Sequence, residues 1–495
     1  MNMKRLGFLC LALLLPLLSH ADGRRLEILF MGDQGHHKPN ERYPQLIKAL
    51  GVHGMNFSYT ENMDDLNPKT LSRYDGLMLY ANINTISSDQ EQAVLDYVAA
   101  GKAFLPIHCA SYCWRNSKAM VELMGGQFKR HGAGTFTVPI DEPEHPIMQG
   151  FEPFETWDET YVHHLHNEKD RTVLQFRDEN GTPEPWTWVR THGKGRIFYT
   201  AYGHDQRTWS HPGFHDLVRR GVLWAVNDEA RAAWAALKPA PLEYEKRETV
   251  QNYEKRKPYP RFQFPLSPDE SKKYIQWPAE FDLDLFASEP DVINPIYIQW
   301  DERGRLWVAE TLDYPNQVND NREGNDRIKI CEDTDGDGKA DTFTIFADKL
   351  NIPTAFVFVN GGVMVAAAPH FYFLKDTDGD DRADQTSIVS SGWGVGDTHA
   401  GPSNLKYGFD NFLYGCVGYS GYRENGVQFG RGIYRFKADF SYVEFLGQFS
   451  NNSWGLGFSE SFDLFGSTAN NCHSVYVGIP MRYYTGIDGL SPRRA

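Results

Sequence analysis

The sequence predicts a multidomain protein in which a doubly wound, flavodoxin-like α/β domain is followed by an all-β, incomplete β-propeller. Two observations predict this fold. Strand-like and helix-like segments alternate between residues 25 and 237, and apolar strand-like segments recur from about residue 293 onward. Alternation is typical of a parallel sheet covered by helices, whereas strands repeating every ~50 residues are typical of propeller blades. With 495 residues, the chain is long enough to form two cores.

The chain begins with a segment typical of a secretory signal peptide. Lys4 and Arg5 precede the apolar run LGFLCLALLLPLLS, and Ser19-His20-Ala21 has the small-x-small pattern of a cleavage site. The run is too short to span a bilayer, and no later stretch is apolar enough, so we expect no transmembrane span. We expect residues 1–21 to be removed and the mature protein to be secreted or periplasmic.

The net charge narrows the classes of binding partner, and the cysteine content indicates what stabilises the fold. The net charge of −15 argues against nucleic acid and anionic membrane surfaces as partners. Of the six cysteines, Cys10 lies in the signal segment and the others are sparse, which does not indicate a disulfide framework. We therefore expect buried apolar cores to stabilise the fold, with Cys109 as a packed thiol.

The predicted α/β domain spans residues 25–237 and ends in a long helix. One helix is expected at 87–102, with Ser88 as its N-cap and Gly101 as its stop. A hairpin is expected at 185–202, turning at Gly193-Lys194-Gly195. Further strands are expected at 26–33, 73–80, 103–108 and 172–178, and helices at 43–54, 117–126 and 214–237.

Residues 238–280 are rich in proline and charge, so we expect a linker there and a partial propeller over 281–495. Four apolar strands begin near residues 306, 362, 412 and 463. Each follows a turn-like tract, namely DERG, VNGG, GFDN and SESF. Each strand is therefore expected to belong to a separate blade.

Two acidic loops are candidates for Ca²⁺ binding. DTDGDGKAD (333–341) and DTDGDDRAD (376–384) place carboxylates at loop positions 1, 3, 5 and 9, where oxygen ligands can converge on a hard cation. The alternative is a pair of solvated acidic turns. The first copy keeps Gly338 at the sharp turn, whereas the second has Asp381 there. The candidate ligands are Asp333, Asp335, Asp337, Asp341, Asp376, Asp378, Asp380 and Asp384.

Histidines and carboxylates gather where the predicted strands of the α/β domain end. The carboxyl ends of strands in doubly wound folds meet at one crevice, so side chains from distant segments are expected to approach one another. Such a cluster could bind a transition metal or supply acid and base groups to a sugar. The alternative is a set of surface and hydrogen-bonded core histidines. The candidates are His36, His37, His108, Asp158, Glu159, His163 and His204.

Residues 26–228 resemble the trehalose-utilisation (ThuA-like) family, a branch of the class I glutamine amidotransferase-like fold. The resemblance rests on GKAFLPIHCAS (101–111), WDETYVHH (157–164) and PWTWVRTHGKGRIFYTAYGHD (185–205). In true amidotransferases a cysteine follows the strand directly, within a glycine-flanked elbow. Here His108 takes that place, Cys109 comes one residue later and no glycine flanks them, so amidotransferase activity is not expected.

The ThuA-like resemblance implies a role in sugar metabolism, with a carbohydrate small molecule, such as a keto-sugar or disaccharide, as the partner. We take His108, Asp158 and Glu159 as catalytic candidates. His36, His37, His163 and His204 are the candidates for binding a substrate or a transition metal in the crevice.

From about residue 280 the chain resembles the propeller of secreted planctomycete-type proteins described as membrane-bound dehydrogenases. These are distantly similar to quinoprotein glucose/sorbosone dehydrogenases. The matching segments include GDTHAGPSNLKYGFDNFLYGCVGYSG (396–421) and STANNCHSVY (467–476). This resemblance implies pyrroloquinoline quinone as hydride acceptor, His399 as the base and a possible redox partner. The alternative for His399 is a residue that stabilises its loop.

Together these features predict an exported protein that processes or oxidises a sugar or keto-sugar. The alternative is a non-catalytic, Ca²⁺-stabilised carbohydrate-binding or scaffold protein. Convergence of the crevice candidates favours the enzyme, whereas scattered side chains favour the scaffold.

Overall fold

The computed structural model describes residues 23–247, 252, 255–257, 259–316 and 318–484. It divides into two compact units, Met1–Leu283 and Asp284–Ala495. The expected signal peptide, residues 1–21, lies outside the described residues. Among the described residues, no helix has both the length and the apolar character needed to cross a membrane.

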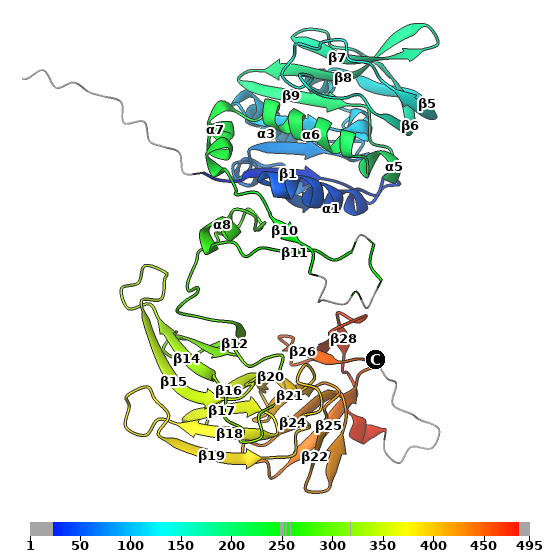
Figure 1. Ribbon diagram of the computed structural model, residues 1–495. Coiled ribbons are helices and arrows are strands. Elements are labelled where there is room, and N and C mark those ends of the chain that lie inside the picture. Colours follow the sequence, from blue (N-terminus) through cyan, green and yellow to red (C-terminus); the bar gives the residue numbers. More distant parts are fainter. Residues whose placement is uncertain (1–22, 248–251, 253–254, 258, 317, 485–495) are drawn as a thin grey trace, which may run out of the picture. The chain divides into compact units, whose positions relative to one another are not determined.

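The first unit is built on a seven-stranded sheet in the order β2-β1-β3-β4-β9-β8-β7 (Figure 1). The strands from β2 to β9 run parallel, and β8 and β7 continue the sheet antiparallel. The predicted doubly wound α/β class is confirmed, although β2 was missing from the prediction. The strands are β1 (Leu26–Met31), β2 (Met55–Thr60), β3 (Gly76–Leu79), β4 (Ala103–Pro106), β7 (Arg171–Glu179), β8 (Thr182–His192) and β9 (Gly195–Thr200).

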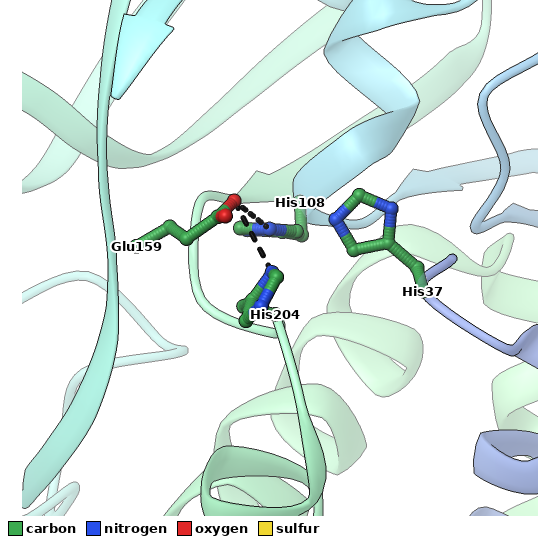
Figure 2. Close-up of side chains that lie close together, drawn as sticks. All are labelled: His37, His108, Glu159 and His204. Carbon is green, nitrogen blue, oxygen red and sulfur yellow. Dashed lines mark ion pairs between the residues drawn. The ribbon is translucent and has the colours of Figure 1, made fainter. Parts of the chain in front are cut away.

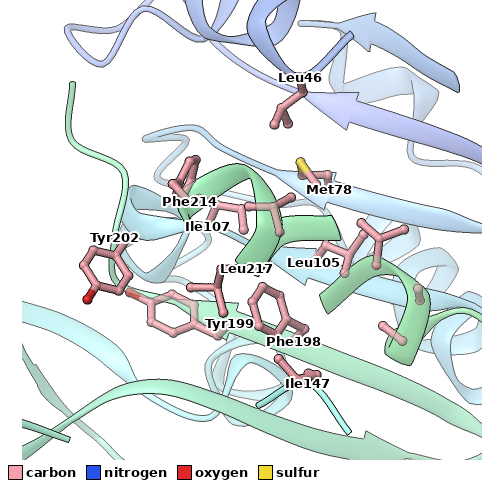
Figure 3. Close-up of a cluster of buried hydrophobic side chains, with 14 of the residues drawn as sticks. Leu46, Met78, Leu105, Ile107, Ile147, Phe198, Tyr199, Tyr202, Phe214 and Leu217 are labelled. Carbon is pink, nitrogen blue, oxygen red and sulfur yellow. The ribbon is translucent and has the colours of Figure 1, made fainter. Parts of the chain in front are cut away.

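Helices cover both faces of this sheet, and alternate strand residues enter two separate cores. Ile28 and Phe30 of β1 pack with α1 (Pro39–Leu50), α6 (Pro212–Ala225) and α7 (Asp228–Leu237). Leu29 and Met31 pack with α3 (Ser88–Ala99) and α4 (Lys118–Met124) on the other face. Figure 3 shows part of the first core, in which Leu46 of α1 is fully buried. Each such large side chain contributes about 1.5–3 kcal/mol on burial.

Three predicted helix boundaries were wrong. The helix expected at 43–54 begins four residues earlier and ends at Leu50, where a 3-10 turn follows. Ser87, not Ser88, caps α3, because its hydroxyl accepts from the Gln90 amide and the Gln90 side chain accepts from the Ser87 amide. The long helix expected at 214–237 is two helices. Asn227 accepts from the Ala230 amide and starts α7, which breaks the chain direction after α6.

Antiparallel pairs complete the first unit. β8 and β9 form the predicted hairpin, in which His192 pairs with Gly195 and Gly193-Lys194 form the turn. A separate two-stranded ribbon joins β5 (Gln127–Thr137) to β6 (Glu155–His164), and neither strand was predicted. The remaining elements are α2 (Pro68–Leu71), α5 (Gln206–Trp209), α8 (Pro268–Lys272), β10 (Tyr244–Glu245), β11 (Phe262–Gln263) and 3-10 turns at Gly51–His53, Met63–Asp65 and His108–Tyr112.

The second unit is all-β, with four sheets in a propeller-like arrangement (Figure 1). The four strands predicted from the repeat are β13, β17, β21 and β27, and each is the second strand of its sheet. The predicted turn tracts are the hairpin turns that lead into them. The sheets are β12 (Pro295–Trp300), β13 (Leu306–Glu310), β14 (Asp326–Glu332) and β15 (Thr342–Leu350); β16 (Ala355–Val359), β17 (Gly362–Ala367), β18 (His370–Lys375) and β19 (Gln385–Ser390); β20 (Pro402–Tyr407), β21 (Leu413–Val417), β24 (Gly432–Phe436) and β25 (Val443–Gln448); and β26 (Ser453–Phe458), β27 (Leu464–Thr468) and β28 (Val475–Tyr476).

Neighbouring sheets of the second unit share apolar cores. Trp307 and Ile328 of the first sheet pack with Phe356 and Val365 of the second. Leu405 and Tyr434 of the third sheet share a further core with residues of the second. This face-to-face packing is what defines the sheets as blades. A short ribbon of β22 (Tyr422–Glu424) and β23 (Val427–Phe429) and a 3-10 turn at Met481–Tyr483 complete the unit.

Candidate functional site

Four side chains from distant segments converge in the first unit (Figure 2). His37 follows β1, His108 follows β4, Glu159 lies within β6 and His204 follows β9. One ligand-capable atom from each lies within 4.8 Å of those of the other three. Three of these positions follow the carboxyl ends of parallel strands of one sheet, in which β4 and β9 are neighbours and β3 separates β1 from β4. Doubly wound folds form their crevice at such strand ends.

The backbone at His108 explains how its ring reaches the crevice. His108 has a φ of 46°, in the left-handed region that residues other than glycine rarely adopt. Gly203 lies opposite, with a φ of 130°, and a Cβ there would come within 3.3 Å of the His108 Cβ. The sharp turn that was thought to need a flanking glycine is therefore formed by His108 itself, and Gly203 leaves room for it.

Hydrogen bonds to the backbone and to an amide orient two of the rings. His108 Nδ1 donates to the Ala201 carbonyl at 2.6 Å, and His37 Nδ1 lies 2.7 Å from Asn82 Oδ1. In each ring the other nitrogen, Nε2, is buried and has no hydrogen-bond partner among the described residues, and the same is true of His204 Nδ1. The crevice therefore contains three ring nitrogens without a well-aligned hydrogen bond to the protein, and the Glu159 carboxylate is the charged group that faces two of them.

Glu159 supplies the negative charge of the crevice. Its Oε2 lies 3.4 Å from His108 Nε2 and 3.2 Å from His204 Nδ1 (dashed in Figure 2). Burial favours the protonated acid, but these two imidazoles outweigh it and hold the pKa of Glu159 well below its usual range. Burial likewise opposes charge on His204, yet the Glu159 carboxylate raises its pKa.

His37 is held neutral. Burial and the neighbouring His108 and His36 rings lower the pKa of His37 to about 2. With Nδ1 beside the Asn82 oxygen, the neutral ring directs the Nε2 lone pair toward the crevice.

Asp158 does not join the four side chains, because adjacent strand residues point to opposite faces. It is fully buried, and its carboxylate accepts from the amides of Gly203 at 2.8 Å and His204 at 3.0 Å and from the Thr208 hydroxyl at 2.8 Å. Burial raises its pKa. The structure therefore places this predicted catalytic residue as the support of the loop that carries His204.

Two other predicted crevice residues lie outside the cluster. Both ring nitrogens of His163 are engaged, by Glu184 and by the Tyr199 hydroxyl, each at 2.9 Å, which makes it a hydrogen-bonded core histidine. His36 is exposed, with its ring 4.0 Å from that of His37, and lies at the rim. Cys109 is fully buried, and burial raises its pKa well above the usual value, as expected of a packed thiol.

The structure adds two residues to the crevice that the sequence analysis missed. The Tyr161 ring stacks on His108 with 4.0 Å between centroids, and His131 Nδ1 lies 3.4 Å from Glu159 Oε1. Both belong to the unpredicted β5–β6 ribbon, in which His131 pairs with Tyr161. Period-2 alternation within WDETYVHH was the available signal, since it puts Glu159 and Tyr161 on one face.

Access to the crevice is limited. His37 and His108 are almost completely buried, whereas the His131 side chain is 44% exposed. A ligand would therefore approach from the side of His131 and His204. A hollow of about 490 Å³ lies elsewhere in the unit, lined by residues such as Tyr59, Arg73 and Glu280.

The two acidic loops of the second unit have matching geometry. Asp333, Asp335 and Asp341 bring one oxygen each within 4.8 Å of one another, and Asp376, Asp378 and Asp384 do the same. Asp337 and Asp380 lie outside these groups, and their carboxylates accept from the amides of Lys339 and Arg382. Three oxygens per loop suit a hard cation in kind but are fewer than Ca²⁺ requires, so other oxygens would have to complete the site.

His399 lies on an exposed loop of the second unit. Its Nδ1 is 3.1 Å from Asp397 Oδ1, and its ring contacts Tyr314 at 5.1 Å between centroids. The side chain is 58% exposed. These contacts are those expected of a residue that stabilises its loop, which is the alternative role given for His399 in the sequence analysis.

Comparisons with known families agree with this division of the chain. Residues 27–225 match the family described as trehalose utilisation (ThuA), and residues 267–492 match a domain of unknown function (DUF7133). The chain therefore has a ThuA-like α/β domain followed by an all-β domain with four propeller-like blades. No curated protein matches the sequence.

Similar solved structures cover the first domain. A ThuA-like protein from Bacteroides uniformis is 18% identical over 41% of this chain and 92% of its own, with a TM-score of 0.37. A ThuA-like protein from Parabacteroides merdae is 18% identical over 41% of this chain and 90% of its own, also with a TM-score of 0.37. A β-galactosidase from Rahnella sp. R3 is 17% identical over 39% of this chain and 31% of its own, with a TM-score of 0.31.

Proposed function

We propose that the ThuA-like domain binds a carbohydrate small molecule, a keto-sugar or disaccharide, in the crevice and processes it chemically. The observation that carries the proposal is the convergence of His37, His108, Glu159 and His204 from four distant segments. Buried polar atoms without partners are costly to maintain in a purely structural protein, which favours an enzyme over a scaffold.

The exposed side of the crevice is suited to proton transfer on a sugar. Glu159 Oε1 faces His131, and these are the groups that an entering hydroxyl or carbonyl would meet first. The His131 imidazole can take a proton from one sugar oxygen and return it to another, while the Glu159 carboxylate 3.4 Å away stabilises the protonated ring.

The test uses the full mature chain and a panel of disaccharides and keto-sugars, with turnover followed by NMR. Glu159→Gln is expected to lower turnover by about 100-fold or more. Glu155→Gln is the matched control, because Glu155 lies on the same strand and is exposed. Turnover that is equal in both variants, or a wild type inactive on every sugar, would contradict the proposal.

Oxidation by the second unit is a separate proposal that rests on its resemblance to quinoprotein dehydrogenases. It requires pyrroloquinoline quinone, His399 acting as base and a redox partner that takes up the electrons. Reconstitution with the quinone should produce sugar-dependent dye reduction that His399→Ala abolishes. Undiminished reduction in that variant would assign His399 to its loop contact with Asp397.

We further propose that the protein acts outside the cytoplasm, as its N-terminal segment indicates. Mass spectrometry of the protein from its native host should show a mature chain that begins at Asp22. A chain that retains Met1 in the cytoplasm would refute export.

A further inference from the structure

The unsatisfied ring nitrogens of the crevice call for a ligand that accepts lone pairs. His108 Nδ1 faces a carbonyl, which can only accept a hydrogen bond, so Nδ1 carries a proton. Nε2 is therefore the nitrogen that offers a lone pair to an incoming cation when the ring is neutral. His37 has the same arrangement with the Asn82 oxygen. Both Nε2 atoms belong to side chains at least nine-tenths buried, and both point into the cluster.

We infer that His37, His108, Glu159 and His204 bind one divalent first-row transition metal ion of the Zn²⁺ type. Such an ion would be held by three imidazole nitrogens and one carboxylate oxygen, a donor set that these metals prefer and that Ca²⁺ and Mg²⁺ do not. A single water molecule donates only two hydrogen bonds, whereas one metal ion accepts from all four side chains.

The distances suit this assignment. In a tetrahedral site with metal–ligand bonds of about 2.0–2.1 Å, neighbouring ligand atoms lie about 3.3 Å apart. Glu159 Oε2 already lies 3.4 Å from His108 Nε2 and 3.2 Å from His204 Nδ1. The other separations reach at most 4.8 Å, so binding requires side-chain contraction of about 1.5 Å or less.

The outer contacts are also those of a metal site. Metal-binding histidines usually donate their second ring nitrogen to a carbonyl or carboxylate, which fixes the tautomer and the ring orientation. Ala201 and Asn82 serve His108 and His37 in this way. Asp158 holds the backbone amide of His204 and so positions the loop that carries the third ring.

This inference deepens the proposed function and rests on it for the role of the ion, which would polarise a sugar oxygen reached from the His131 side. Metal binding itself is measured without any sugar. If the ion binds and no sugar is turned over, the proposed function fails alone. If chelated, metal-free protein still turns sugar over, the metal inference fails alone.

The experiment titrates Co²⁺ into chelator-stripped mature protein with excess Ca²⁺ present to occupy the acidic loops of the second unit. We expect one equivalent of Co²⁺ to bind with the intense visible absorption of a four-coordinate site, and Zn²⁺ to displace it. His37→Ala and Glu159→Gln should each weaken binding by at least tenfold. His53→Ala, an exposed histidine outside the crevice, should bind as the wild type does.

Circular dichroism checks that each variant folds. Glu159→Gln preserves side-chain shape, so it decides the matter if an alanine variant unfolds. Absence of the absorption band in the wild type would overturn the inference, as would wild-type affinity in a folded Glu159→Gln variant.

Discussion

The backbone at residues 108 and 203 holds the crevice in a conformation that the chain would not adopt unaided. A non-glycine residue at positive φ costs about 1–3 kcal/mol, so the packing around His108 must compensate for it. Tyr161 stacks on the ring, and Ala201 accepts its hydrogen bond. The backbone strain therefore lies at His108, the residue whose conformation brings its ring into the crevice.

Replacing Gly203 should show how closely the two segments depend on each other. Gly203→Ala introduces a Cβ that approaches both the His108 Cβ and the Ile107 side chain, at a φ that L-residues avoid. We expect a loss of about 2–4 kcal/mol in the free energy of unfolding, measured by urea denaturation. Gly150→Ala is the control, because Gly150 also has positive φ but open space around its added Cβ. Equal losses would mean that backbone strain alone, without the His108 contact, accounts for the effect.

Glu27 provides a pH-dependent test of burial in the same sheet. Burial raises the pKa of this carboxyl from its usual value to about 7. At pH values between the usual glutamate pKa and about 7, the folded chain retains a proton that the unfolded chain has released. The free energy of unfolding therefore falls as the pH rises toward 7. The effect on the free energy of unfolding is on the order of 3 kcal/mol. Glu27→Gln should therefore gain stability over the wild type between pH 5 and pH 8, as measured by urea midpoints.

Glu144→Gln, an exposed substitution, controls for the change in net charge. A stability difference between Glu27→Gln and wild type that does not change with pH would show that Glu27 is not kept protonated by burial.

Tertiary contacts, which no local sequence pattern reveals, decide which candidate residues belong to the crevice and which do not. His37, His108 and His204 were among the predicted residues because they follow recognisable strands, and Glu159 because it belongs to the WDETYVHH segment of the ThuA-like resemblance. His163 was included on the same grounds, but both of its ring nitrogens are hydrogen-bonded, to Glu184 and Tyr199, which come from other strands. Whether a histidine is available or engaged depends on such partners, which only the folded chain brings together.

At the scale of elements, strands with a strong local signature were predicted and those without one were missed. The second strands of the first three blades are buried on both faces, β27 alternates buried and exposed residues, and each of the four follows a turn tract, so all four were found. β5 is largely exposed and contains Gly132 and Gly134, which weakens its strand signal. Without β5 the ribbon that carries Glu159 and His131 could not be predicted from the sequence.

Each acidic loop joins the third and fourth strands of its own sheet, β14 to β15 and β18 to β19. The geometry of these loops distinguishes two candidate Ca²⁺ ligands. The sequence pattern makes both Asp333 and Asp337 ligands, whereas the structure groups Asp333 with Asp335 and Asp341 and leaves Asp337 out. We expect Asp333→Asn to weaken Ca²⁺ binding about tenfold or more and Asp337→Asn to weaken it less, because ligand charge sets affinity. Isothermal titration measures both. No Ca²⁺ binding by the wild type would leave the loops as solvated turns.

At the scale of the whole molecule, the two units have separate cores and should unfold separately. The apolar clusters of residues 23–283 share no member with those of 284–484. Differential scanning calorimetry should therefore show two transitions. Zn²⁺ should raise the midpoint temperature of one transition, and Glu159→Gln should abolish that shift. Ca²⁺ should raise the midpoint temperature of the other transition, and Asp333→Asn should abolish that shift. A single transition moved by both ions would show that the units unfold as one.

The pairing of β4 with β9 also determines when the crevice can exist during biosynthesis. His37 and His108 emerge early from the ribosome, but His204 follows β9, which pairs with β4 and is the last strand of this sheet along the chain. Contacts between residues so far apart in sequence form slowly, since a long loop must close before they stabilise anything. A nascent or translocating chain therefore contains the separate histidines but no assembled crevice. Whatever the crevice binds can be captured only after the whole domain has folded, in whichever compartment folding is completed.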